Sequence, residues 1–245
     1  PDTAAATAET ASTEQETVPA VTIPPPAEAP PADGLHAVEL AGGLFHTCAR
    51  MNDGTVRCWG MGEDGQLGDG ARQNRNAPVT VEGLDRVVQL AIEGSRSCAV
   101  RDDGTVWCWG AWAIVDAVEA QLAADAAVPL ELLRAVPERM EVWNGVRQLA
   151  IGSGNDCAVD GEGRVLCRGS NTRGGVGDGS ADRRLDPAPV PGVTAVEVAV
   201  QMDSTCARTT DGRVLCWGWN DYCGQLGDGT KVDRLGPVEV PGLSG

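Results

Sequence analysis

The chain has 245 residues, a formal net charge of −16, and 32 glycines against one phenylalanine and one tyrosine. Such a negative charge weighs against nucleic acid as a partner, because binding to a phosphate backbone depends on lysine and arginine. The sequence contains no run of about 18 apolar residues, so we expect no membrane-spanning helix. The many glycines indicate many tight turns and therefore an all-β fold of short strands.

Residues 1–33 form a segment of alanine, threonine, glutamate and proline with almost no large apolar side chain. Such a composition cannot bury enough apolar surface to offset the entropy that folding costs. We therefore expect residues 1–33 to be a disordered tether that proteases remove readily, and residues 34–245 to form the folded region.

Four segments of the folded region align without gaps through pairs of cysteines that are ten positions apart. The pairs are Cys48 with Cys58, Cys98 with Cys108, Cys157 with Cys167, and Cys206 with Cys216. The units recur at intervals of about 50 to 60 residues, which is typical of propellers and solenoids. The approximate unit boundaries are residues 35–84, 85–141, 142–192 and 193–245.

Each cysteine pair flanks a predicted β-hairpin. A three-residue loop with a left-handed glycine places Met51 opposite Thr55 in the first unit, and strand alternation then places Cys48 opposite Cys58. The Cα atoms of such a pair lie roughly 4.5 Å apart, which a disulfide can span. Four disulfides, and hence an oxidising compartment, are the preferred interpretation, with buried free thiols or a zinc site as alternatives. Cys223, the ninth cysteine, has no partner in this pattern.

Further motifs follow the hairpins. Cys-Trp-Gly begins at Cys58, Cys108 and Cys216, and Gly-Gln-Leu-Gly-Asp-Gly occupies residues 65–70 and 224–229. Together with a strand before each hairpin, this arrangement resembles the regulator of chromosome condensation repeat family in its cysteine-rich bacterial form. The resemblance covers residues 35–245 and implies a β-propeller of four-stranded blades, commonly seven to a ring. Four blades leave such a ring incomplete, so the chain is either a fragment or is completed by a second copy or a partner chain.

Two units depart from the repeat. The third unit has Arg168 where the others have tryptophan, and the second unit lacks the Gly-Gln-Leu-Gly-Asp-Gly segment and inserts residues 111 to about 136. Ile114, Val118 and Leu122 are spaced four apart, which predicts one amphipathic helix ending before Pro129. We interpret this helix as filling the gap left by the missing blade residues, with a docking element as the alternative.

Several motifs resemble known binding or catalytic sites but lack the neighbouring elements or residues that such sites require. Residues 60–65 match the alternating glycines of dinucleotide sites, but a hairpin precedes them and no helix follows. Asp69, Asp178 and Asp228 lie in Gly-Asp-Gly turns without the spaced carboxylates that calcium requires. Neither of the two histidines accompanies a nucleophile motif. We predict no cofactor, no metal and no enzymatic activity.

Positions that vary between units are free to serve a partner, and they cluster in loops before and after the paired cysteines. The expected partner-binding residues are Phe45, His46, Arg96, Asn155, Met202 and Tyr222. The leading hypothesis is a non-enzymatic protein-binding module that is secreted, periplasmic or anchored at the outer surface through its tether. From the resemblance, an enzyme inhibitor is its concrete form, and a guanine-nucleotide-exchange regulator is the first alternative. An envelope hydrolase is the second.

Overall fold

The computed structural model describes residues 34–111 and 133–243, and every regular element in these residues is a β-strand. Leu35–Gly245 forms one compact unit. The predicted tether of residues 1–33 and the predicted inserted helix lie outside the described residues. The inserted segment is shorter than expected, because residues 134–136 already belong to the last strand of the second blade.

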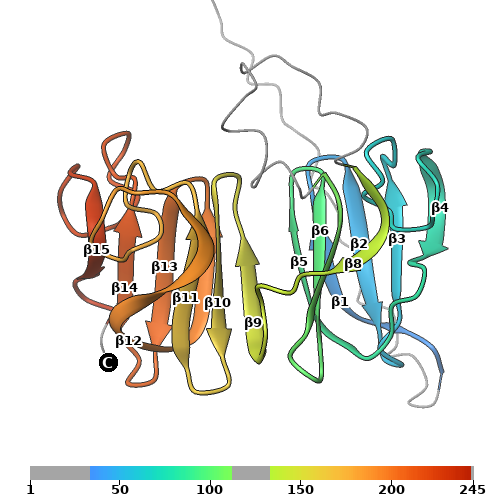
Figure 1. The fold of residues 1–245 in the computed structure, drawn as a ribbon, viewed down its shortest axis with the longest axis horizontal. Coiled ribbons are helices and arrows are strands. Elements are labelled where there is room, and N and C mark those ends of the chain that lie inside the picture. The colour runs from blue at the N-terminus through green and yellow to red at the C-terminus, as the bar shows by residue number, and fades with distance from the viewer. Residues whose placement is uncertain (1–33, 112–132, 244–245) are drawn as a thin grey trace, which may run out of the picture. The chain divides into compact units, whose positions relative to one another are not determined.

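The first two blades are separate four-stranded antiparallel sheets (Figure 1). Within each blade the strands pair in chain order. Blade 1 consists of β1 (Ala37–Gly42), β2 (His46–Met51), β3 (Val56–Gly60) and β4 (Arg75–Thr80). Blade 2 consists of β5 (Val87–Glu93), β6 (Arg96–Arg101), β7 (Val106–Gly110) and β8 (Arg134–Arg139).

Blades 3 and 4 are joined by one long strand. Its first half pairs with the third strand of blade 3, and its second half is the first strand of blade 4. Blade 3 contains β9 (Val146–Ile151), β10 (Asn155–Asp160), β11 (Arg164–Gly169) and the start of β12 (Arg184–Gln201). Blade 4 contains the end of β12 and β13 (Ser204–Thr209), β14 (Val214–Gly218) and β15 (Arg234–Glu239).

The hairpins that contain the paired cysteines have the predicted register. Met51 N donates to Thr55 O at 2.8 Å, and Gly54 has a φ of 79°, as a left-handed loop glycine should. Cys48 lies directly opposite Cys58, with the Cα atoms 4.1 Å apart. Disulfides join the same four pairs that the spacing predicts.

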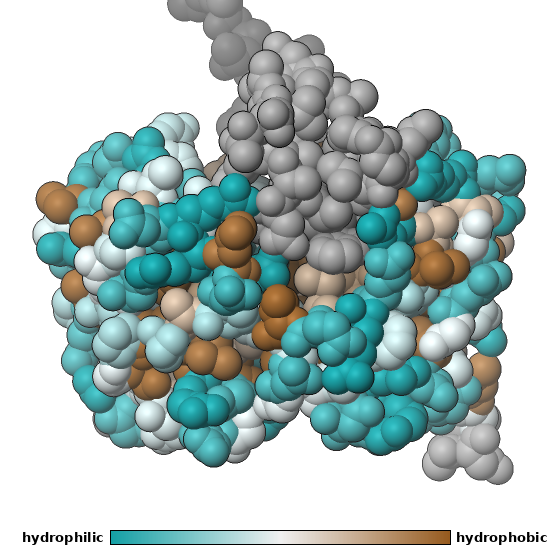
Figure 2. All heavy atoms as spheres, in the orientation of Figure 1, coloured by the Kyte–Doolittle hydropathy of each residue, from teal (hydrophilic) through white to brown (hydrophobic). Residues whose placement is uncertain are grey.

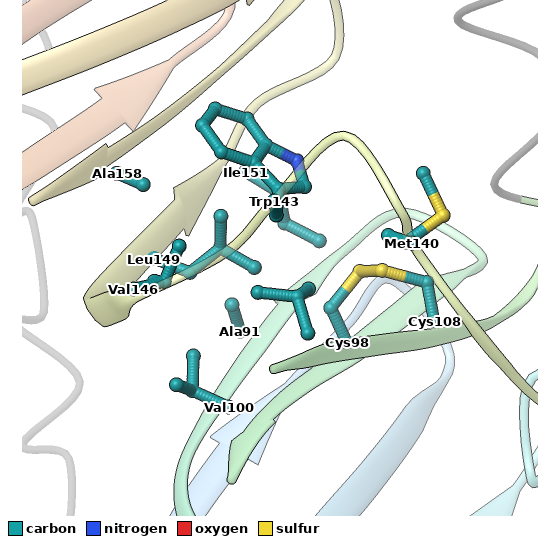
Figure 3. Close-up of a cluster of buried hydrophobic side chains, with 11 residues drawn as sticks. Ala91, Cys98, Val100, Cys108, Met140, Trp143, Val146, Leu149, Ile151 and Ala158 are labelled. Atoms are coloured by element: carbon teal, nitrogen blue, oxygen red, sulfur yellow. A yellow bond between two sulfur atoms is a disulfide. The ribbon is translucent and has the colours of Figure 1, made fainter. Parts of the chain in front are cut away.

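The hydrophobic core lies between adjacent blades, because each sheet is too thin to bury side chains alone. The cluster between blades 2 and 3 packs Trp143, Met140 and the Cys98–Cys108 disulfide against Leu149 and neighbouring residues of blade 3 (Figure 3). Equivalent clusters join blade 1 to blade 2 and blade 3 to blade 4. The first three disulfides belong to these clusters, whereas the fourth belongs to none of them.

Candidate functional site

One end of every blade carries the loops that vary between units. The turn before the second strand and the loop after the third strand are neighbours, since His46 pairs with Gly60 and Met61 N donates to Phe45 O at 2.9 Å. We call this end the loop rim. It consists of residues 43–45, 61–65, 94–95, 152–154, 170–174, 202–203 and 219–224.

Three of the six expected partner-binding residues are exposed on the loop rim. The side chains of Phe45 and Tyr222 are 65% and 76% exposed, and Met202 is also exposed. Phe45 and Tyr222 are the only phenylalanine and the only tyrosine of the chain. Apolar side chains lie in separate patches among polar ones on the face seen in Figure 2.

The other three expected residues, His46, Arg96 and Asn155, are buried, so placing them in accessible loops was wrong. Each is the first residue of a second strand, and its side chain reaches the next blade. His46 Nε2 contacts Ser97 Oγ at 2.8 Å. Arg96 pairs with Asp156 at 2.9 Å, and Asn155 donates to Thr205 Oγ1 at 3.0 Å. These side chains connect adjacent blades.

A pocket of about 440 Å³ opens at the loop rim of blade 4. Its wall includes Val200, Met202, Cys206, Trp219 and Tyr222, and is mostly apolar. The Trp219 and Tyr222 rings lie 5.8 Å apart between centroids, a spacing at which aromatic side chains attract each other. Rigid aromatic side chains around a hollow are the usual anchors of protein partners.

Met202 holds an unusual backbone conformation at this pocket. Its φ is 51°, in the left-handed region that suits glycine, and blade 2 has Gly94 at the equivalent position with a φ of 57°. A side chain other than glycine costs on the order of 1 kcal/mol in this region. Blade 4 thus presents an exposed apolar side chain at a position where glycine would be less strained.

Charged groups surround the aromatic pair. Arg173 of blade 3 lies 5.0 Å from the centre of the Trp219 ring and pairs with Asp221 at 3.0 Å. The hydrogen bond from Trp219 and the Arg173 charge lower the pKa of Asp221. Burial raises the pKa of Asp203, against the opposing effect of Arg173. The rim of blade 4 therefore combines an aromatic surface with carboxylates held by one arginine.

The expected partner-binding residues did not include Trp219 or Arg173. A signal was present, because the loop from Gly218 to Gly224 is one residue longer than the loop from Gly60 to Gly65. The longer loop carries Tyr222 and the exposed free thiol of Cys223, which also lines the pocket. A repeat that lengthens one rim loop and adds an aromatic residue marks that blade as different from the others.

No group of three or more histidine, cysteine, aspartate or glutamate side chains that could hold a metal occurs in residues 34–111 and 133–243. In the same part of the chain, no helix has the length and apolar character needed to cross a bilayer.

Family models agree with the repeat pattern. Models of the regulator of chromosome condensation repeat match residues 37–66, 53–100 and 211–245. The solved human WBSCR16 structure superposes on 85% of the chain with a TM-score of 0.70 at 25% identity. The chain is built from regulator of chromosome condensation repeats. Saccharomyces cerevisiae Prp20p, at 22% identity and a TM-score of 0.66 over 86% of the chain, shares this propeller fold.

The chain matches only part of the length of its curated relatives. The ultraviolet-B receptor UVR8 of Arabidopsis thaliana is 31% identical over 84% of the chain, which covers 46% of the receptor. The human E3 ubiquitin-protein ligase HERC2 is 32% identical over 84% of the chain, which covers 4% of the ligase. The chain thus spans less than half the length of these relatives. It also covers 53% of the WBSCR16 chain and 52% of the Prp20p chain.

Proposed function

We propose that this repeat protein is a non-enzymatic, extracytoplasmic binding module whose loop rim holds a partner protein. The observation that carries the proposal is the exposure of the single phenylalanine and the single tyrosine on the loop rim, beside Met202 and the blade 4 pocket. Aromatic side chains and methionine are enriched at protein interfaces, whereas a folded chain gains nothing by exposing them. The strained backbone of Met202 supports the same assignment.

The four disulfides support the extracytoplasmic part of the proposal, because such bonds persist in oxidising compartments. A partner with basic groups and an apolar protrusion suits a rim that joins aromatic rings to carboxylates. Inhibition of a secreted enzyme is a concrete form of this activity. Prp20p is described by its binding to Gsp1p and histones, so a nucleotide-exchange role is the second candidate.

The test replaces the three exposed rim residues together, with Phe45, Met202 and Tyr222 changed to serine. A matched control changes Val88, Val136 and Leu185 to serine, which are exposed apolar residues outside the loop rim. Captured envelope proteins are identified by mass spectrometry, and each is titrated against both variants. We expect at least a tenfold loss of affinity for the rim variant alone. Equal affinity for both variants would remove the loop rim as the binding surface.

A further inference from the structure

A pocket of about 400 Å³ opens between blades 2 and 3, at the ends of the strands that lie opposite the loop rim. Blade 2 contributes Val88 and the hairpin turn from Arg101 to Gly104, and blade 3 contributes residues 145–147 and Gly161. We call this hollow the hairpin pocket. Both of its walls are adjacent blades of the described chain, and it shares no residue with the loop rim.

Two glycines open the pocket on its blade 3 side. In both blades the hairpin turn donates a backbone hydrogen bond to the residue before the first strand, from Asp102 N to Arg86 O and from Gly161 N to Gly145 O, each at 3.0 Å. In blade 2 the side chains of this pair also bind each other, with Arg86 Nε donating to Asp102 Oδ2 at 3.1 Å. In blade 3 both residues are glycine, so no ion pair covers the main chain there.

Gly161 is not required by the fold. Its φ lies outside the left-handed region, and an added Cβ would meet nothing within 4 Å. The equivalent residues of the other blades all have side chains, and they are Asn52, Asp102 and Thr210. Glycine serves in proteins where a ligand or another main chain must approach the backbone closely. Gly161 therefore indicates a group from outside the chain.

Arg147 supplies a free positive charge to the pocket. It is the extra residue of a β-bulge, because its neighbours Val146 and Gln148 pair with consecutive residues of β10. The other three blades have the same bulge with a valine in it, at Val38, Val88 and Val196. A bulge re-aims the side chain of its extra residue. The exposed Arg147 guanidinium forms no ion pair or hydrogen bond with any residue that the structure describes.

The blade 2 wall carries carboxylates. Asp102 is already paired, as described above, and the Arg101 guanidinium is held by Asp85. Hydrogen bonds from Thr105 lower the pKa of Asp103, so this carboxylate keeps its charge at neutral pH. The pocket thus offers an unpaired guanidinium on one wall and a hydrogen-bond acceptor on the other. A fitting ligand carries a negative group beside a hydrogen-bond donor.

We propose that the hairpin pocket binds a peptide carboxylate together with a neighbouring amide N–H. Arg147 would bind the carboxylate through two parallel hydrogen bonds, the geometry that a planar guanidinium favours. Asp103 would accept from the amide N–H, Val88 would contact an apolar side chain of the peptide, and Gly161 would let the peptide main chain approach. The carboxylate can be a C-terminus or an acidic side chain. Phosphate has no N–H for Asp103 and fits only half of the site.

Titration of the ¹⁵N-labelled full chain with short peptides tests the site, with the amides of Gly104, Gly145 and Gly161 as reporters. The first probe is N-acetylated alanyl-alanyl-valine with a free C-terminal carboxylate. The second is the same peptide as its C-terminal amide, and the third is N-acetylated alanyl-glutamyl-alanine amide. We expect saturable shifts with a Kd of about 1 mM from the first probe, the third or both, which identifies the source of the carboxylate. The second probe should give none.

Two variants borrow residues that other blades have at the same positions. Arg147→Val gives the bulge its usual valine, and Gly161→Thr gives the turn the residue of blade 4. We expect each to weaken peptide binding at least about tenfold and to leave the chain folded. The matched controls are Arg208→Val, which removes the same charge from another exposed arginine, and Gly42→Thr, where an added Cβ also meets nothing within 4 Å. Both controls should bind like the parent.

Three results would each overturn the proposal. The first is the absence of saturable shifts from both carboxylate peptides up to about 20 mM, well above the expected Kd. The second is equal binding of the amidated peptide or of inorganic phosphate. The third is unchanged affinity in either Arg147→Val or Gly161→Thr. None of these measurements involves the loop rim, so they leave the proposed function to its own test.

Discussion

Side chains at the start of the second strands illustrate how context decides the role of a residue. His46, Arg96 and Asn155 differ in charge and size, and variation of that kind suggests freedom to bind a partner. Each is instead matched to its neighbour in the next blade, Ser97, Asp156 and Thr205. A buried polar group must find a hydrogen-bond partner, so these positions vary in pairs.

The buried imidazole of His46 predicts a pH dependence of stability. Burial lowers the pKa of His46 to about 4, below its unfolded value of about 6.5. Between these values the unfolded chain binds a proton that the folded chain does not, so the free energy of unfolding falls as the pH falls. By pH 5 this loss is about 2 kcal/mol. Below about pH 4 both states are protonated, and the loss stops growing.

The variant His46→Asn isolates this effect, because asparagine already serves at the equivalent position 155. Urea unfolding at pH 7 and pH 5 should show a drop that is about 2 kcal/mol smaller in the variant than in the parent. The carboxylates titrate in both proteins and cancel in the comparison. An identical drop in both would mean that His46 titrates normally in the folded chain.

Met202 predicts a conflict between stability and binding. Replacing it with glycine, which blade 2 has at the equivalent position, relieves the left-handed backbone. We expect Met202→Gly to stabilise the protein by about 0.5 to 1 kcal/mol, measured by urea unfolding at pH 7. The same variant should bind the partner more weakly, because it loses an exposed anchor. A variant that is less stable, or that binds unchanged, would show that Met202 serves packing.

Hairpins and interfaces differ in how far the sequence could predict them. The register of Cys48 and Cys58 followed from alternation over eleven residues, a local rule that needs no tertiary information. The burial of Arg96 did not, because Asp156 lies 60 positions away and meets it only when blades stack. A local sign existed, since polar residues occur side by side at positions 46–47, 96–97, 155–156 and 204–205. Consecutive residues of a strand face opposite sides, so such a pair can serve both neighbours.

The loop after the third strand of blade 3 contacts a tryptophan of blade 4. This contact predicts that alanine substitutions at two equivalent glycines differ in their cost to stability. Gly177 and Gly227 occupy the same repeat position with φ of 77° and 69°, but only Gly177 faces a tryptophan of the next blade. We expect Gly177→Ala to destabilise the chain by about 1 to 3 kcal/mol more than Gly227→Ala. The backbone strain is shared and the added Cβ at Gly227 meets only Val240, at 3.2 Å, so the difference in the free energy of unfolding reports mainly the contact with Trp217. Equal costs would mean that the tryptophan moves aside freely.

At the scale of the whole molecule, stability comes from interfaces and not from individual blades. The three hydrophobic clusters each draw residues from two adjacent blades. In such repeat arrays the stability is approximately a sum of unit terms and nearest-neighbour terms. Blades 2 and 3 have two covered faces, whereas blades 1 and 4 each have one in the described structure. The terminal blades should therefore open more readily.

Hydrogen exchange of the full chain can measure this difference. We compare the second strand of each blade, since every one is paired on both sides and disulfide-linked. Amides of β6 and β10 should exchange at least about tenfold more slowly than those of β2 and β13, a difference of about 1.4 kcal/mol in opening free energy. Uniform exchange across the four strands would mean that the chain opens only as one cooperative unit.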